Sequence, residues 1–289
     1  MPDQPPPLSV VIPTRRGYER MGPILERFAA PVKAVDGEVV VVDGSGDAPD
    51  VPDWVRWIPS KESDWLRLTD VAIREARGEV IVIGEDHTFP TPDFCDAVLR
   101  AHAEHPDADL IAGCLVNGAE DTVTGRANFL LVGPPYVPGI AELPAERPPP
   151  TSVMSFKRRL ISILNGPGSL ETSVAPRLFV ERRIAVDDRI VAEHDQDLGF
   201  FGTMHNRYKA SRAMYGYARP GDRAHRREVI RWVIKRGPGV LLRPARASAG
   251  TGLRARVDLL AAAVFVASAA VGGAVGTLFG PGKAPNQFY

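Results

Sequence analysis

Cysteine is scarce in this 289-residue chain, and neither sign of charge prevails. Cys95 and Cys114 are too few for a disulfide framework, so nothing in the sequence requires an oxidising compartment. The 35 Lys and Arg balance the 35 Asp and Glu, which excludes a chain that is acidic or basic throughout. The opening residues, "MPDQPPPLSVVIP", lack the basic start and long apolar core of a signal peptide. With 44% hydrophobic and 24% charged residues, the composition is that of a folded protein with a sizeable core.

The charge is balanced overall but unevenly spread. Residues 207–256 carry fourteen Lys and Arg against only Asp222 and Glu228, a pattern typical of segments that bind nucleic acid or anionic lipid. Residues 259–279, "LLAAAVFVASAAVGGAVGTLF", follow this stretch and are uncharged. At about 1.5 Å per residue they match the ~30 Å hydrocarbon core of a bilayer, although their Ala and Gly also suit a buried helix of a soluble protein. We therefore favour membrane lipids over nucleic acid as the partner.

The apolar segment also carries small residues at regular spacing. Ser268, Gly272 and Gly276 recur every fourth residue and predict a face on which another membrane helix packs, which leaves homo-oligomers open. The basic stretch precedes the segment, whereas only Lys283 follows it. By the positive-inside rule, we expect a single-pass protein of the inner (cytoplasmic) membrane with its bulk in the cytoplasm.

Strands and helices alternate in the first 116 residues. Apolar runs at 8–13, 38–42, 80–83 and 110–116 read as buried strands, and helical spacing appears over 18–30, 64–76 and 93–105, with Gly78 as the cap of the second helix. Continuous rather than alternating apolar strands predict a parallel α/β sheet covered on both faces. The Pro-rich segment 133–151 predicts a loop.

Polar side chains follow two of these strands where the strands end. Asp43 closes the second strand, and Glu85, Asp86 and His87 come directly after the third. Ligands of parallel α/β sheets gather beyond the carboxyl ends of the strands. Alternatively, the triplet is only a solvated strand end, and Asp43 only a turn residue of "DGSGD".

Five segments in this order resemble glycosyltransferases of family 2, which have the GT-A fold. They are "LSVVIPTRR", "EVVVVDGSGD", "AIREARGEVIVIGEDHTFPTPDF", "TSVMSFKRRLI", and "GSLETSVAPRL" followed by "RIVAEH". The resemblance covers residues 8–219 and implies a Rossmann-like, mostly parallel sheet that transfers a sugar from a nucleotide-diphosphate donor. The motif of Glu85, Asp86 and His87 stands where the family has Asp-x-Asp, so it departs from the usual pattern.

The resemblance also implies a metal site. A departing nucleotide diphosphate needs a cation, and Mn²⁺ or Mg²⁺ takes oxygen ligands, with imidazole acceptable to Mn²⁺. Glu85 and His87 would bracket the metal, and Asp86 is a further candidate ligand. His194, at the end of "RIVAEH", would complete the metal shell or touch the diphosphate, unless it is a packing histidine; His205 competes for this role.

Two carboxylates compete for the role of general base. Glu171 falls where inverting family members usually carry the Asp that deprotonates the acceptor hydroxyl. It could instead be an ordinary carboxylate at the start of a helix. Asp195, in "EHDQDL", is the second candidate.

The resemblance implies a nucleotide pocket at the ends of the first two strands. Asp43 would accept a nucleobase N–H, and Pro13, Thr14, Arg15, Gly44 and Ser45 would line the same pocket. A nucleotidyltransferase is disfavoured, because no Gly-rich, Lys-containing phosphate loop follows the first strand.

The sequence therefore predicts a catalytic GT-A domain over 1–219, a basic amphipathic membrane-interface segment over 220–256, a transmembrane helix over 257–280 and a short tail over 281–289. We expect an inverting, metal-dependent glycosyltransferase of the cell envelope that acts on a lipid-linked or membrane-proximal glycan. The alternative is a catalytically silent relative that binds a nucleotide sugar and serves as a membrane-bound assembly partner.

Overall fold

The computed structural model describes residues 5–144 and 148–287. The chain divides into two compact units, the first comprising Met1–Val116 and Tyr136–His194 and the second Asn117–Pro135 and Asp195–Tyr289. The chain thus leaves the first unit at Val116, returns to it at Tyr136 and leaves it again after His194. The predicted catalytic segment 1–219 contains the first unit and part of the second, and its outer boundary stays a prediction.

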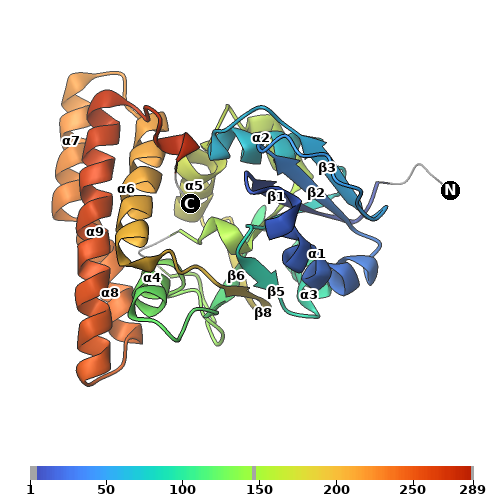
Figure 1. The fold of residues 1–289 in the computed structure, drawn as a ribbon, viewed down its shortest axis with the longest axis horizontal. Helices are drawn as coiled ribbons and strands as arrows, with labels where there is room; N and C mark the ends of the chain where they lie inside the picture. Colours follow the sequence, from blue (N-terminus) through green and yellow to red (C-terminus); the bar gives the residue numbers. More distant parts are fainter. Residues whose placement is uncertain (1–4, 145–147, 288–289) are drawn as a thin grey trace. The chain divides into compact units, whose positions relative to one another are not determined.

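A sheet forms the centre of the first unit (Figure 1). It has eight strands in the order β3-β2-β1-β4-β7-β6-β8-β5. The strands are β1 (Leu8–Thr14), β2 (Glu38–Asp43), β3 (Val55–Pro59), β4 (Val80–Ile83), β5 (Thr88–Pro90), β6 (Leu110–Asn117), β7 (Met154–Lys157) and β8 (Ile184–His194). The four strands predicted from apolar runs are all present. The short β3 and β5 were not predicted, since neither carries a continuous apolar run.

Strand direction changes across this sheet. β1 runs parallel to β2 and β4, and β2 runs parallel to β3, which is the predicted α/β arrangement. β7 pairs antiparallel with both β4 and β6, and β5 pairs antiparallel with β8. The sheet is therefore mixed, with a parallel half whose strands end at a common edge.

Helices cover both faces of the parallel half, as expected. They are α1 (Gly17–Lys33), α2 (Trp65–Glu75), α3 (Phe94–Glu104) and α5 (Ala175–Val180). Alternate residues of one face, such as Val11 and Val40, join Leu68 of α2 and Leu178 of α5 in one buried cluster. On the other side, α1 and α3 pack together, and the rings of Phe28 and Phe94 meet edge to face at 6.2 Å.

The structure bears on two local predictions, the cap of α2 and the Pro-rich segment. Helix α2 ends at Glu75 and is capped by Ala76, so Gly78 is not its cap. A Cβ at Gly78 would lie 2.5 Å from the backbone nitrogen of Ser9, so Gly78 allows close approach to β1. The Pro-rich segment contains no helix or strand within its described residues, 133–144 and 148–150, as predicted, and 145–147 lie outside the described part.

The second unit is helical (Figure 1). Its elements are α4 (Val123–Val132), α6 (Gly199–Tyr217), α7 (Arg223–Lys235), α8 (Gly237–Ser248), α9 (Leu253–Phe279) and a short 3₁₀ turn at Ala284–Asn286. Ala127 of α4, Ala245 of α8 and Phe265 of α9 belong to one buried cluster. The guanidinium of Arg126 holds the buried carboxylate of Asp258 in two hydrogen bonds of 2.9 and 3.1 Å, which ties α4 to α9.

Helix α9 is long and apolar enough to cross a membrane, with 39% of its most apolar window buried. Its small-residue face packs against α6 of the same chain, so this face is not presented to a further membrane helix. Ser268 donates a hydrogen bond of 2.8 Å to the carbonyl of Met204. Cβ atoms at Gly272 and Gly276 would lie 2.1 and 2.3 Å from the carbonyl oxygens of Tyr208 and Arg212. The predicted oligomer contact is thereby occupied by α6.

We predict that Gly272→Ala destabilises the protein, because the added methyl group must push α6 and α9 apart. Overpacking of this kind typically costs about 1–3 kcal/mol in the free energy of unfolding. Gly239→Ala in α8 is the matched control, since its Cβ would meet nothing within 4 Å. Alanine there should stabilise the helix by up to about 1 kcal/mol. Thermal denaturation of both variants checks the prediction, and equal shifts in Tm would contradict it.

Candidate functional site

The parallel strands bring their carboxyl ends to one edge of the first unit. Thr14 at the end of β1 lies opposite Asp43 at the end of β2. Ile83 at the end of β4 lies opposite Val11, and the amide of Gly84 still donates to the carbonyl of Val11 at 2.9 Å. The triplet Glu85–His87 therefore follows directly at the same edge as Thr14 and Asp43.

Three side chains at this edge converge as metal ligands could. One ligand atom each from Glu85, His87 and His194 lies within 4.8 Å of the other two, and both histidines are buried. Oε2 of Glu85 lies 3.1 Å from Nε2 of His87, and the rings of His87 and His194 meet edge to face at 4.9 Å. The pairing of β5 with β8 accounts for this, because it sets Thr88 opposite His194.

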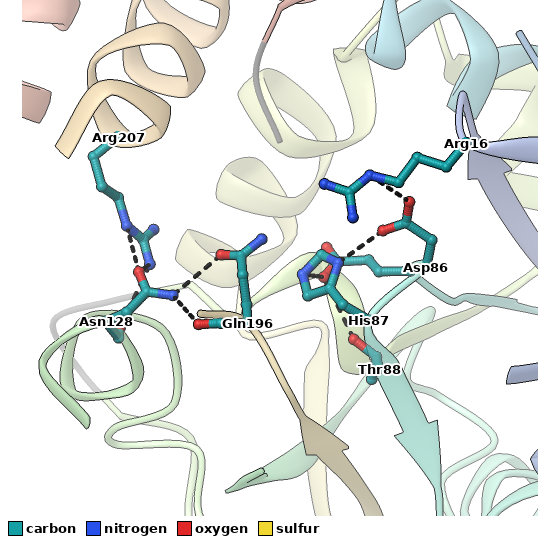
Figure 2. Close-up of polar contacts among 8 residues, drawn as sticks. Arg16, Asp86, His87, Thr88, Asn128, Gln196 and Arg207 are labelled. Carbon is teal, nitrogen blue, oxygen red and sulfur yellow. Dashed lines mark hydrogen bonds and ion pairs between the residues drawn. The ribbon is translucent and has the colours of Figure 1, made fainter. Parts of the chain in front are cut away.

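Asp86 points to different partners (Figure 2). Its Oδ1 lies 2.9 Å from Nδ1 of His87. Its Oδ2 accepts a hydrogen bond from Thr14 at 3.5 Å and lies 3.8 Å from Nε of Arg16. Asp86 was a candidate metal ligand, but the group formed among the described residues does not include it. Instead, its carboxylate orients the ring of His87 and favours the tautomer with the proton on Nδ1, as carboxylates behind metal-ligating histidines do.

The donor set fits a divalent cation. Two imidazoles and one carboxylate favour Mn²⁺ over Mg²⁺, because Mg²⁺ prefers oxygen ligands throughout. Zn²⁺ also accepts this combination. His87 directly precedes β5 and His194 ends β8, and these two strands are paired, so the backbone places both imidazoles side by side.

Protonation opposes metal binding at this site. Burial lowers the pKa of His87, but hydrogen bonds and charge from Asp86 and Glu85 outweigh it and raise the pKa to about 9. Burial alone would raise the pKa of Asp86, yet His87, Arg16 and Arg20 together lower it. A cation must therefore displace a proton from His87 at neutral pH.

We predict that Mn²⁺ binding strengthens as pH rises toward 9 and releases a proton at pH 7. Titration calorimetry in two buffers of different ionisation enthalpy measures both effects. His87→Ala and His194→Ala should each weaken binding by tenfold or more, since each removes a ligand. His105→Ala is the matched control, because His105 lies at the end of α3 and is not in the ligand group. Unchanged affinity in His87→Ala and His194→Ala would remove these residues from the site.

The predicted nucleotide pocket lies at the ends of β1 and β2. Pro13 and Thr14 are buried in β1, and Asp43 is fully buried. The carboxylate of Asp43 accepts hydrogen bonds from both the amide and the hydroxyl of Ser45, so it holds the turn. Its contact with a nucleobase stays a prediction.

Two further residues predicted to line the nucleotide pocket, Gly44 and Arg15, contact the backbone of the segment before α2. Gly44 is required for close approach, since a Cβ there would lie 2.3 Å from the carbonyl oxygen of Glu62. Arg15 donates to the carbonyl of Ser63 at 3.2 Å, which ties the end of β1 to the segment before α2. The loops after β1 and β2 are therefore held against a third segment.

Glu171 lies in a π-helical turn, Leu170–Val174, that leads into α5. Its side chain is half-buried, and Oε1 is shielded from solvent without a hydrogen-bond partner in the structure. It lines a small cavity together with Asp70, Thr69 and Ser169. Burial raises the pKa of Glu171 to about 7, and the charges of Asp70 and Glu85 add to the shift. This carboxyl is therefore poised to exchange a proton near neutral pH.

We predict that Glu171→Gln stabilises the metal-free protein at pH 8 and not at pH 5. A raised folded-state pKa means that stability is full below the unfolded value, here 4.5, and is lost as pH rises through about 7. The amide carries no charge, so the variant should gain about 1–3 kcal/mol at pH 8. Thermal melts at both pH values, with Glu75→Gln on the exposed end of α2 as the control, measure the difference. A gain that is independent of pH would contradict this.

The remaining candidates belong to the second unit. Asp195 is exposed and follows directly after β8. His205 is exposed on α6, with its ring 6.5 Å from that of Tyr208, and it is not part of the metal-ligand group found among the described residues. The placement of Asp195 near a reacting group stays a prediction.

The segment after β8 is held by a network that the sequence did not indicate (Figure 2). The amide of the buried Asn128 donates to the side chain of Gln196 at 3.1 Å, and Nε of Arg207 donates to Oδ1 of Asn128 at 3.0 Å. Thr122 donates to Asp197 at 2.6 Å. Asn128 lies 68 residues before Gln196, so no local pattern could reveal the pair.

Comparison with solved structures identifies the fold. The chain is similar to a mannosyltransferase from Pyrobaculum calidifontis, solved with GDP-Man and Mn²⁺, at a TM-score of 0.52 and 17% identity over 94% of this chain and 88% of that one. It is also similar to residues 1–349 of TarS from S. aureus, at a TM-score of 0.46 and 16% identity over 90% of each chain. No protein-family model matches, and no curated protein matches. The chain has a glycosyltransferase-like fold.

Proposed function

We propose that this protein is an inverting, metal-dependent glycosyltransferase of family 2 type that uses a nucleotide-diphosphate sugar. The convergence of Glu85, His87 and His194 at the carboxyl edge of the sheet carries this proposal. Two further observations support it: the fold is shared with a mannosyltransferase, and a carboxyl of raised pKa, Glu171, lies within electrostatic reach of Glu85.

Each residue has a defined task in this proposal. Glu85, His87 and His194 hold a divalent cation, which when bound neutralises the charge of the departing diphosphate. Asp86 holds the ring of His87 in the orientation for binding, and Arg16 and Thr14 hold Asp86. Asp43, with Pro13, Thr14, Arg15, Gly44 and Ser45, lines the nucleotide pocket. These residues all come from the ends of β1, β2, β4 and β8.

Glu171 is the proposed general base. It takes the proton of the acceptor hydroxyl as the oxygen attacks the anomeric carbon and the bond to the diphosphate breaks, which inverts the configuration. A pKa of about 7 keeps a substantial fraction of Glu171 ionised at neutral pH while its basicity exceeds that of an ordinary carboxylate. Asp195 is the second candidate for this task.

We further propose that the enzyme works at the inner membrane, on its cytoplasmic side, and that the acceptor is a lipid-linked or membrane-proximal glycan. The fourteen basic residues of 207–256 and the apolar helix α9 support this location. The competing function is a silent relative that binds a nucleotide sugar without transferring it. The departures from the usual family residues at Glu85, His87 and Glu171 favour that alternative.

A donor panel with Mn²⁺ separates the two functions. We expect hydrolysis or transfer of one nucleotide sugar, and GDP-mannose and UDP-GlcNAc are the first to test because structural neighbours were solved with them. Glu171→Gln should bind the same donor with unchanged affinity, while transfer falls by roughly 10²–10⁴, as is typical of losing a general base. The transfer rate of the wild type should rise with pH and level off near or above pH 7. The residual rate of Glu171→Gln should not show this rise.

Asp195→Asn, the variant of the second candidate, is the matched control and should retain most of its transfer rate. Full activity in Glu171→Gln with loss in Asp195→Asn would reverse the two roles. Donor binding without hydrolysis or transfer across the panel would favour the silent relative.

A further inference from the structure

The outer face of α9 is a continuous apolar stripe. Its members recur every three, four or seven residues and so lie on one side of the helix. They are Leu253, Val257, Leu260, Val264, Val271 and Leu278. Leu253 and Leu260 are 78% and 69% exposed, respectively. The opposite side, which includes Phe265 and Gly272, is buried within the second unit. The stripe is longer than the scattered exposed apolar residues of ordinary surfaces, and such patches mark interaction sites.

The stripe continues into an open groove between α8 and α9. The groove is lined by Leu242, Arg246, Arg256, Leu259, Leu260 and Ala263. Both arginines are exposed, and Leu260 belongs to the groove and to the stripe. An apolar floor between two cations matches a lipid that carries an acyl chain and a phosphate.

The packing of α6 on α9 opposes a spanning orientation. Tyr208 and Arg212 lie beside Gly272 and Gly276, so α6 runs parallel to α9 along residues 272–276. Arg207, Lys209 and Arg212 of α6 would then lie at the depth of the uncharged segment 259–279. Cations at that depth of a bilayer are costly. A helix that lies along the membrane surface keeps them in the polar region instead.

The charge of the second unit indicates the kind of surface. Residues 207–256 carry fourteen Lys and Arg against two acidic residues. Those of α7 and α8 that are exposed include Arg223, Arg227, Arg231, Lys235, Arg243 and Arg246. Arg246 of α8 and Arg256 of α9 lie beside the stripe at Leu260, whereas α7 packs on another side of α9, where its Val233 meets Gly273. Cations beside an apolar stripe are complementary to an anionic bilayer.

We propose that the second unit docks on an anionic lipid bilayer through the apolar stripe of α9. The stripe enters the acyl boundary, α9 lies along the surface, and the α8–α9 groove holds one anionic phospholipid between Arg246 and Arg256. This inference goes beyond the proposed sugar transfer and does not depend on it, since lipid binding needs neither donor nor metal.

Co-sedimentation of the purified full chain with vesicles tests the surface. Wild-type protein should bind vesicles of phosphatidylcholine with phosphatidylglycerol and bind pure phosphatidylcholine much less. Leu260→Glu should weaken binding by roughly tenfold or more, because it removes an exposed leucine from the stripe. Val180→Glu is the matched control, since Val180 is 79% exposed in the first unit, and its binding should equal that of the wild type.

A second pair of variants tests the groove. Arg246→Ala should weaken binding to the anionic vesicles about fivefold, the effect of one cation near a charged membrane. Lys61→Ala, on an exposed loop of the first unit, should have no effect. Because all four positions are on the surface, circular dichroism melts should match the wild type. Absence of binding by the wild type, or equal losses in test and control variants, would overturn the proposal.

Labelling decides between lying along the membrane and crossing it. Gly221→Cys and Lys283→Cys, made separately, each add one accessible thiol, before α7 and after α9, since the native Cys95 and Cys114 are buried. In sealed inside-out membrane vesicles, an impermeant maleimide should label both. Protection of Lys283→Cys alone shows that α9 spans and overturns the surface mode. Light scattering without lipid tests whether a second copy of the chain covers the stripe. A wild-type dimer that Leu260→Glu dissociates would show such a contact and would also overturn the proposed membrane docking.

Discussion

The placement of one buried imidazole, that of His87, is the constraint on which the rest of the site depends. Its two nitrogens face different carboxylates, Asp86 at Nδ1 and Glu85 at Nε2, so the ring is fixed by charge on both sides. Without a cation, this arrangement holds a proton tightly, and the pKa of about 9 expresses that. Glu85, His87 and His194 also each offer one ligand atom within 4.8 Å of the other two. A proton on His87 and the proposed cation would therefore be alternative ways to neutralise this buried cluster of carboxylates.

A second consequence of burial appears at Glu171. The carboxyl of Glu171 lies near Glu85 and Asp70 and is partly removed from water, so its ionisation destabilises the folded protein. The same surroundings raise its pKa and make it a stronger base. Basicity and stability are therefore opposed at this residue, as expected if Glu171 serves as the proposed general base. The buried sheet stabilises the fold enough to tolerate this cost, since β1, β2 and β4 are buried along almost their whole length.

Helix α9 of the second unit has two different faces. The small residues of α9 allow α6 to approach to backbone contact, whereas its large aliphatic residues face outward. Composition alone cannot separate these faces, because a spanning helix and a helix packed on one side have the same hydropathy. The helix that packs against α9 distinguishes the two cases. Here that helix is α6, which carries Arg207, Lys209 and Arg212.

The sequence by itself determined the elements and their order. Apolar runs predicted β1, β2, β4 and β6, helical spacing predicted α1, α2 and α3, and strand ends predicted where polar ligands would gather, because these signals are local. Only the tertiary structure decided which atoms meet. His194 reaches His87 through the pairing of β5 with β8, Asp86 turns from a candidate ligand into the partner of His87, and the small face of α9 is filled by α6. The physical reason is that periodicity reports the face that a residue occupies, whereas contact between distant segments depends on register and packing that no single window of sequence contains.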